Sequence, residues 1–175
     1  MFFIHPLLHL LRPTPTRSQP RSRIFLLIYA NMFGRPFWHS PRKLVDFEMD
    51  GPGTSKQVFD IYSFSHITHG VLLYFLLKPL NLSKKIYVAL FIEVLWEIFE
   101  NTPYIINKYR RRKEYENYDG DSIVNIVGDC LCALLGYLIC AYSESAGVVL
   151  AIVLEVILIP YGANFLRVGI GALMM

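Results

Sequence analysis

Three carboxylates at helical spacing lie within an apolar stretch near the middle of this 175-residue chain. Glu93 and Glu97 are four residues apart and Glu100 follows three residues later, so on a helix they share one face. Asn101, four residues after Glu97, extends that face. If the helix lies in a membrane, each buried charge costs at least a few kcal/mol unless it is paired, protonated or hydrated. The stripe therefore requires partners from other parts of the chain.

Two other segments carry polar side chains at similar spacing. His66 and His69 are three residues apart, and Asp121, Asn125 and Asp129 recur every four residues. Ionisable residues inside a membrane usually face the interior of a bundle or a water-filled cavity. We therefore expect one polar intramembrane cluster, with these members: His66, His69, Glu93, Glu97, Glu100, Asn101, Asp121, Asn125 and Asp129.

This set of side chains is compatible with three roles. In the first, imidazole and carboxylate ligands hold zinc, iron or manganese, with His66, His69 and Glu97 as candidate ligands, although the Glu-x-x-His repeats of di-iron bundles are absent. In the second, the stripes form a pocket for a lipid head group or a path for protons, with histidine titrating near neutral pH. In the third, they are a hydrogen-bond network that fixes the register and depth of the helices. Apart from a metal, no cofactor is expected.

The composition indicates a small membrane protein. The chain is 54% hydrophobic and its mean hydropathy is +0.38, which is high for a soluble domain. The predicted fold is an all-α integral membrane bundle of about four transmembrane helices, with a peripheral, irregular N-terminal segment. Apolar stretches place these helices at residues 62–80, 85–106, 122–142 and 146–159. Pro103 is expected to kink or end the second of them. Pro160 and Gly162 interrupt the last helix, so the apolar tail after it either spans the membrane or re-enters it.

The chain divides into three parts. Residues 1–33 form a basic, acid-free leader or interfacial segment, residues 34–61 a polar irregular linker, and residues 62–175 the helical membrane domain. Arginine-rich leaders without acidic residues are typical of mitochondrial transit peptides. We therefore predict the mitochondrial inner membrane as the location, with a bacterial inner membrane as the alternative.

A basic cluster follows the second predicted helix. It consists of Lys108, Arg110, Arg111, Arg112 and Lys113. Clusters of this kind at the edge of a membrane attract anionic lipid head groups, and each residue contributes about 1 kcal/mol. The expected partners are membrane lipids and other integral membrane subunits, and no nucleic acid.

Five stretches together resemble one family. They are Gly34-Arg-Pro36, residues 60–70 (DIYSFSHITHG), residues 93–102 (EVLWEIFENT), residues 105–110 (IINKYR) and residues 120–129 (GDSIVNIVGD). Over about residues 34–165 the chain resembles the small alphaproteobacterial inner-membrane proteins of domain of unknown function 2585. The order of His, Glu and Asp/Asn on successive helices is also similar in layout to VanZ-like membrane proteins. The resemblance implies a helical membrane fold and no particular activity.

The chain departs from this family at two places. Family members typically begin with a clear first span, which residues 1–33 replace poorly. They also often carry cysteines just after Gly-Arg-Pro, where this chain has Phe37-Trp38-His39. Any role of those thiols is therefore lost here.

Two functions compete on these observations. A protein of alphaproteobacterial type behind such a leader suggests a mitochondrial descendant, and this predicts a non-catalytic accessory or assembly subunit of an inner-membrane respiratory complex. The alternative is a membrane enzyme or lipid-binding protein that acts on a lipid or isoprenoid phosphate, with Glu or His as acid or base and with or without a metal. The three polar stripes contain no Lys or Arg that could meet a phosphate. This shortage of cations favours the accessory subunit.

Overall fold

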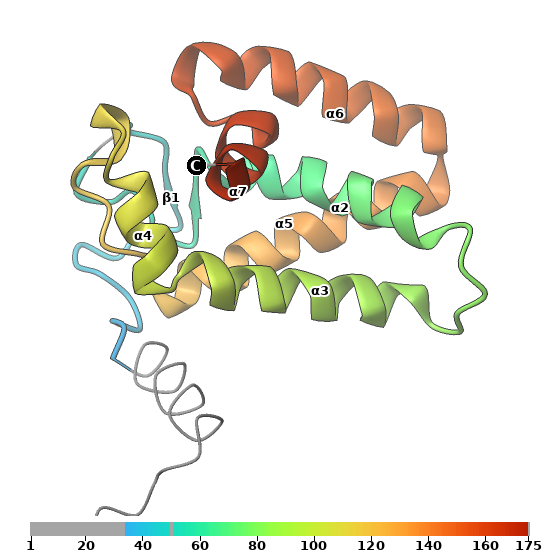
Figure 1. Cartoon of the computed structure of the whole chain (residues 1–175), viewed down its shortest axis with the longest axis horizontal. Coiled ribbons are helices and arrows are strands. Elements are labelled where there is room, and N and C mark those ends of the chain that lie inside the picture. The colour runs from blue at the N-terminus through green and yellow to red at the C-terminus, as the bar shows by residue number, and fades with distance from the viewer. Residues whose placement is uncertain (1–33, 50, 175) are drawn as a thin grey trace, which may run out of the picture.

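The computed structural model describes residues 34–49 and 51–174, and this part of the chain is mostly helical (Figure 1). Its elements follow in the order β1 (Val45–Asp46), β2 (Phe59–Asp60), α2 (Ser63–Leu77), α3 (Lys85–Glu100), α4 (Pro103–Tyr109), a 3-10 turn (Lys113–Tyr115), α5 (Ile123–Tyr142), α6 (Glu144–Leu158), a 3-10 turn (Ile159–Tyr161), a π-helical turn (Leu166–Ile170) and α7 (Gly171–Met174). β1 and β2 pair in parallel and join only two residues each. The predicted leader, residues 1–33, lies outside the described residues.

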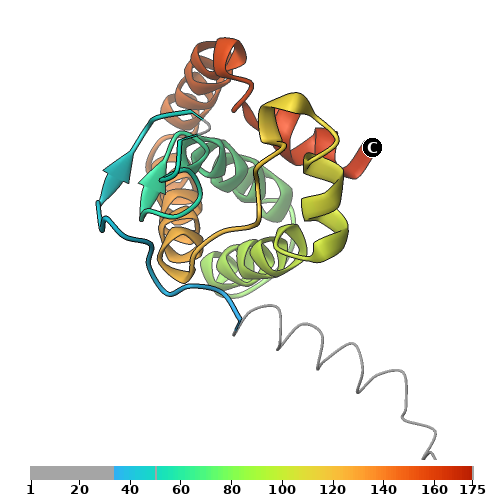
Figure 2. The ribbon, with the colours of Figure 1, turned by 90° about the vertical axis from the view of Figure 1, so that its left-hand side faces the viewer.

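Four helices lie side by side and alternate in direction along the chain (Figures 1 and 2). α2 and α5 pack against each other, and each of them also contacts α3 and α6. The connections α2–α3 and α5–α6 lie at one end of the bundle. α4, the strand pair and the loop before α5 gather at the other end, which we call the polar cap (residues 34–61 and 101–122).

The α2–α5 contact depends on two glycines. A Cβ atom added at Gly70 would lie 1.8 Å from the carbonyl oxygen of Ala133, and one added at Gly136 would lie 2.0 Å from that of Ile67. The main chains of the two helices therefore touch, as small residues allow in membrane bundles. This contact fixes the position of α2, which carries His66 one residue before Ile67.

Two of the described helices are long and apolar enough to cross a membrane, namely α5 with 20 residues and α6, with its 3-10 extension, with 18. Valine and isoleucine side chains cover the outer side of α6, where Val149, Ile152 and Val156 are exposed. α2 and α3 have 15 and 16 residues and carry the buried polar stripes. The structure thus shows a helical protein with two candidate spans.

The second predicted helix, residues 85–106, consists of two helices. α3 stops at Glu100 and α4 begins at Pro103, the residue at which the sequence predicts a kink or an end. Proline suits the first position of a helix, because its fixed φ is helical and its missing N–H would have no partner there. The Thr102 hydroxyl caps α4 by accepting a hydrogen bond from the Ile105 amide at 3.4 Å. The proline therefore starts a second helix and does not merely kink the first.

Residues 34–49 and 51–61, the segment predicted as a linker, contain only the short strands β1 and β2 as regular structure and pack against the helices as part of the polar cap. Gln57 is 1% exposed. Its side-chain oxygen accepts hydrogen bonds from the Trp38 indole at 2.8 Å and from the Lys43 amide at 2.7 Å. A buried glutamine with satisfied hydrogen bonds ties the segment together.

The C-terminal tail turns back over the bundle after α6 (Figure 1). Gly162, at φ 66°, supplies the left-handed residue of the turn. The Glu155 carboxylate, an acidic group within the apolar part of α6, accepts hydrogen bonds from the amides of Phe165 at 2.7 Å and Leu166 at 3.2 Å. Glu155 therefore holds the tail against α6, and these hydrogen bonds account for an acidic residue in the apolar part of that helix.

Candidate functional site

The structure brings the nine residues of the predicted polar cluster to one region, where α2, α3 and α5 meet the polar cap. None of the nine is more than 8% exposed, and Glu93 and Asn101 have no exposed surface. The helical spacing therefore placed each stripe on an inward face.

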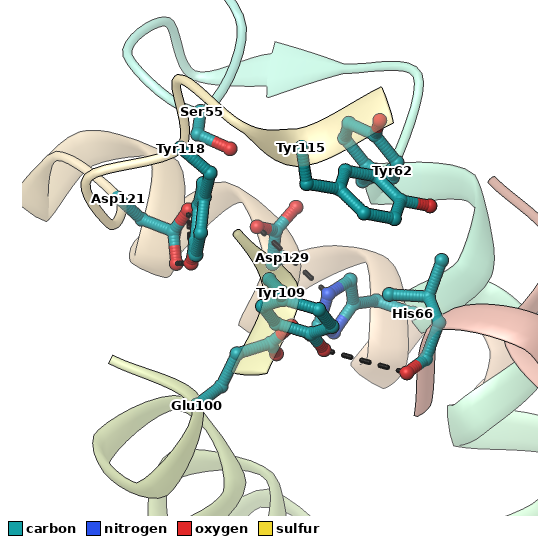
Figure 3. Close-up of a pocket in the computed structure, with 10 residues that line it drawn as sticks. Ser55, Tyr62, His66, Glu100, Tyr109, Tyr115, Tyr118, Asp121 and Asp129 are labelled. Carbon is teal, nitrogen blue, oxygen red and sulfur yellow. Dashed lines mark hydrogen bonds and ion pairs between the residues drawn. The ribbon is translucent and has the colours of Figure 1, made fainter. Parts of the chain in front are cut away.

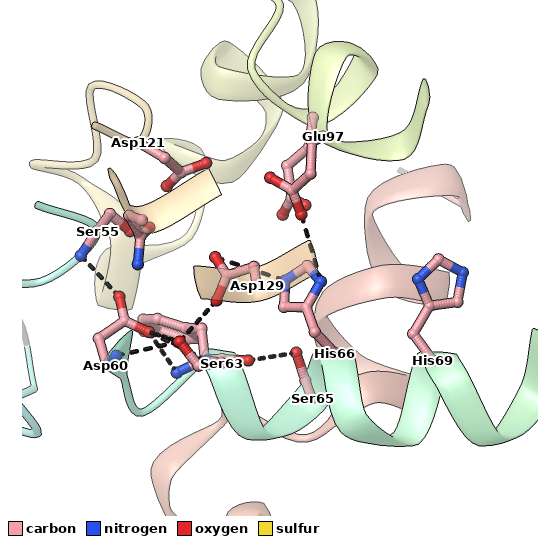
Figure 4. A network of polar contacts seen from close by, with 12 residues as sticks. Ser55, Asp60, Ser63, Ser65, His66, His69, Glu97, Asp121 and Asp129 are labelled. Atoms are coloured by element: carbon pink, nitrogen blue, oxygen red, sulfur yellow. Dashed lines mark hydrogen bonds and ion pairs between the residues drawn. The ribbon is translucent and has the colours of Figure 1, made fainter. Parts of the chain in front are cut away.

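Both histidines project from the same side of α2 toward α3 (Figure 4). His66 Nδ1 lies 2.7 Å from Glu93 Oε1 and 3.3 Å from Glu97 Oε1. His69 Nδ1 lies 2.6 Å from Glu93 Oε2. One face of the His69 ring stacks on Phe165, whose ring centroid is 5.2 Å away, and Trp96 meets it edge-on at 5.8 Å. The two imidazoles and the carboxylates of Glu93 and Glu97 thus form a compact group, which we call the His–Glu centre.

Several atoms of the His–Glu centre have no hydrogen-bond partner. They are both side-chain oxygens of Glu97, Oε2 of Glu93 and Nδ1 of His69. The short approach of His69 to Glu93 is therefore not an aligned hydrogen bond. Native proteins leave few buried polar atoms unsatisfied, and each one requires a physical explanation.

The other carboxylates of the cluster are hydrogen-bonded. Asp121 and Asn101 form a reciprocal pair, in which the Asn101 side-chain amide donates to Asp121 Oδ2 at 2.6 Å and its oxygen accepts from the Asp121 amide at 2.8 Å. The Ser63 hydroxyl donates to Asp129 Oδ1 at 2.6 Å. The Tyr109 hydroxyl donates to Glu100 Oε1 at 2.7 Å. These groups belong to a satisfied network around the His–Glu centre.

Sequence reasoning missed the contribution of the polar cap. The Arg35 guanidinium donates to the main-chain oxygens of Asn101 at 2.6 Å and Asp121 at 3.2 Å. A cation therefore does reach the cluster, although none lies on the three stripes. The only hint in the sequence was the Gly34-Arg-Pro36 motif.

Asp60 adds an acidic group to the edge of the cluster. It is 1% exposed and accepts hydrogen bonds from the amides of Ser55 at 2.7 Å, Tyr62 at 2.8 Å and Ser63 at 3.1 Å. Burial, with a smaller effect of the nearby Asp121 charge, raises the pKa of Asp60 to about 6, against the opposing effect of these amides. Burial also raises the pKa of the Tyr118 hydroxyl, which hydrogen-bonds to Asp121 at 3.1 Å.

A cavity of about 40 Å³ connects the cluster to the polar cap (Figure 3). Its lining includes His66, Glu100, Asp129 and the rings of several tyrosines. Such a volume holds a few water molecules or a small ion. A wider cleft of about 540 Å³ shares Tyr62, Tyr115 and Tyr118 with it. These tyrosines therefore separate the buried cluster from a cleft on the outside of the polar cap.

The predicted head-group site is only partly exposed. Lys108 is 8% exposed and lies over the Tyr104 ring at 4.8 Å, so it is not available to a lipid. Arg112 is half-buried and donates to the Arg167 main-chain oxygen at 3.1 Å. Arg110, Arg111 and Lys113 are exposed beside the polar cap.

Comparison with known proteins identifies relatives but no solved structure. The family described as "Protein of unknown function (DUF2585)" matches residues 31–169. A UPF0314 protein of Sinorhizobium fredii is 41% identical over 118 residues, which are 65% of this chain and 60% of that protein. A UPF0314 protein of Brucella anthropi is 43% identical over 93 residues, which are 50% of this chain and 46% of that protein.

The matched region thus covers about half to three fifths of the length of these relatives. No solved structure shows a significant match. Because the family match covers most of the described residues, the chain belongs to the DUF2585 family, whose relatives here come from alphaproteobacteria.

Proposed function

We propose that the protein is a membrane enzyme whose His–Glu centre performs acid–base chemistry at the depth of the lipid head groups. The observation that carries the proposal is the carboxylate of Glu97, which is 1% exposed and has no hydrogen bond to either oxygen. Its one polar contact is the ion pair with His66 at 3.3 Å. A network that served only to hold helices together would hydrogen-bond such a group, because a buried carboxylate without hydrogen-bond donors lowers stability. Strained or unsatisfied polar groups are tolerated where chemistry requires them.

The position of the centre fits this role. His66 is the fourth residue of α2, and Glu97 is three residues before the last residue of α3. At a rise of about 1.5 Å per residue, both lie roughly 5 Å from the end of the bundle that the polar cap covers. If α2, α3, α5 and α6 all lie in the membrane, as we propose, this level is that of the lipid head groups and not of the bilayer centre.

A lipid or isoprenoid phosphate remains the substrate class that we propose. Exposed arginines beside the polar cap would attract an anionic lipid to this end of the bundle. The three polar stripes contain no cation that could meet a phosphate, but the Arg35 guanidinium lies beside the cluster, where it donates hydrogen bonds to main-chain oxygens. We further propose an inner membrane as the location, and the mitochondrial variant of this proposal still rests on the leader alone.

The accessory-subunit hypothesis has a separate observation in its favour. The outer side of α6 exposes Val149, Ile152 and Val156, and such a face can contact another subunit. Lipid tails would cover the same face equally well. The apolar face therefore fits both hypotheses, whereas the carboxylate without hydrogen bonds supports the enzyme.

A comparison of two variants tests the proposal without knowledge of the reaction. Glu97→Met replaces an acid without hydrogen bonds by an apolar side chain of similar length, and Asn101→Leu removes a side chain with satisfied hydrogen bonds. After treatment with a chelator, we expect Glu97→Met to be as stable as the wild type or more stable, by up to about 3 kcal/mol, because the buried carboxylate has no hydrogen bond and His66 keeps its contact with Glu93. Asn101→Leu should lose about 1–3 kcal/mol, because it leaves Asp121 without its partner.

Activity is then measured on the same preparations. Wild-type protein in liposomes is given lipid and isoprenoid phosphates, and release of inorganic phosphate is followed. We expect turnover by the wild type and none by Glu97→Met. Loss of stability in Glu97→Met, together with purification of the wild type in a complex of fixed stoichiometry, would refute the proposal and favour the accessory subunit.

A further inference from the structure

We propose that His66, His69, Glu93 and Glu97 bind one divalent transition-metal ion. The inference deepens the proposed function and rests on it for its chemistry, because an ion here would supply the charge that a phosphate requires. The binding site itself is argued from the geometry of the four side chains.

Hydrogen bonding divides the buried cluster into two parts. Asp121, Asp129 and Glu100 each have a donor from a neighbouring side chain. Glu93 contacts both imidazoles and Glu97 contacts that of His66, and Glu97 has no hydrogen bond at all. The two carboxylates thus have no donor besides the imidazoles, and a divalent cation would supply a positive partner shared by all four side chains.

The distances among His66, His69 and Glu93 are those of ligands that surround one ion, and Glu97 lies beside this trio through its contact with His66. The donor atoms of His66, His69 and Glu93 all lie within 4.8 Å of one another. In a tetrahedral zinc site with bonds of about 2.0–2.1 Å, neighbouring donors are roughly 3.3 Å apart. The separation of His66 Nδ1 from Glu97 Oε1 is 3.3 Å, while those to Glu93 are 2.6–2.7 Å. Entry of an ion therefore moves Glu93 outward by roughly half an ångström.

The ligand types indicate which ions fit. Two imidazoles and two carboxylates suit zinc, manganese or iron(II), and the absence of a thiolate disfavours copper(I). The remaining nitrogen of His66, Nε2, faces Asp129 Oδ2 at 4.0 Å, and Ser63 fixes that carboxylate. A carboxylate behind a ligating histidine is the usual outer partner of such sites, because it orients the ring. Figure 4 shows Ser63, Asp129, His66 and Glu97 in this order.

A second trio of donors overlaps with this one and must be distinguished. The donor atoms of His66, Glu97 and Glu100 also lie within 4.8 Å of one another. Glu100, however, already accepts the Tyr109 hydrogen bond at 2.7 Å and lines the small cavity. We therefore place Glu100 outside the ligand set, facing the cavity through which an ion or water enters.

Metal binding is tested on the full-length chain, purified in mild detergent, stripped with a chelator and titrated with Co²⁺. Co²⁺ substitutes for zinc and gives intense visible absorption in a tetrahedral site. We expect about one Co²⁺ per chain and displacement of the colour by Zn²⁺. His66→Ala, His69→Ala, Glu93→Gln and Glu97→Gln should weaken binding at least about 10-fold. Circular dichroism and gel filtration establish that each variant is folded.

Two controls decide between the alternatives. Glu144→Gln removes a half-exposed carboxylate at the opposite end of the bundle and should bind Co²⁺ like the wild type. Glu100→Gln should also retain binding; loss of binding in this variant would move the site to the second trio and overturn our ligand set. No visible band in the wild type, or equal loss in Glu144→Gln, would overturn the metal site altogether. If Glu97→Met is nevertheless stable and inactive, the acid–base proposal stands without the metal.

Discussion

The glycine contact between α2 and α5 gives the sharpest test of how the site is held in place. A methyl group added at Gly136 would lie 2.0 Å from the main-chain oxygen of Ile67, and one at Gly70 would lie 1.8 Å from that of Ala133. Neither oxygen can rotate away, because both belong to helical main chain. Each substitution to alanine therefore forces the two helices apart.

The expected magnitude follows from two opposing effects. Replacing glycine by alanine inside a helix favours the helix by about 1 kcal/mol. Overpacking a tight contact costs about 1–3 kcal/mol, and here the obstacle is main chain, so we take the upper part of this range. Gly70→Ala and Gly136→Ala should each lower the free energy of unfolding by about 1–2 kcal/mol. The double variant should lose less than the sum, because helices separated by the first methyl group leave room for the second.

The assay is reversible unfolding in mixed micelles, followed by circular dichroism. Gly171→Ala is the matched control, since its added Cβ would meet only the end of the flexible Arg112 side chain, at 2.6 Å. This variant should be unchanged or slightly more stable. Single variants at Gly70 and Gly136 that remain within about 0.5 kcal/mol of the wild type, or losses that add fully, would refute the proposed main-chain contact.

Two further predictions concern the edges of the fold. Because the pKa of Asp60 is raised to about 6, the folded protein binds a proton that the unfolded chain releases above its ordinary pKa of 3.8. This contribution to stability is present below pH 4 and is lost as the pH rises to 6. The stability of Asp60→Asn relative to the wild type, measured by thermal unfolding at each pH, should therefore rise across this range. A stability difference between the two proteins that stays constant from pH 4 to pH 6 would contradict the raised pKa of Asp60. Glu155→Ala removes the acceptor of the Phe165 and Leu166 amides, and trypsin should then cut after Arg167 about 10-fold faster, whereas an unchanged rate would show that other contacts hold the tail.

The sequence predicted which polar residues of the helices face inward, but it did not predict the side chains of the polar cap that contact them. Spacing of three and four residues placed His66, His69 and the three glutamates on inward faces, because a helix repeats every 3.6 residues. The same reasoning could not find Arg35 or Tyr109, since both reach the cluster through tertiary contacts of the polar cap. Helical periodicity carries no information about side chains that arrive from a loop or from a separate short helix.

The stripes themselves contain two kinds of residue that spacing cannot separate. Asn101 and Glu97 are four residues apart on one face of the same helix region, and both are buried to 1% exposure or less. Asn101 is bonded to Asp121 through two reciprocal hydrogen bonds, so replacing it costs stability. Glu97 has no hydrogen-bond partner, so replacing it should abolish the proposed activity without lowering the free energy of unfolding. The sign of the stability change at these two positions therefore separates a structural network from a functional site within one helical face.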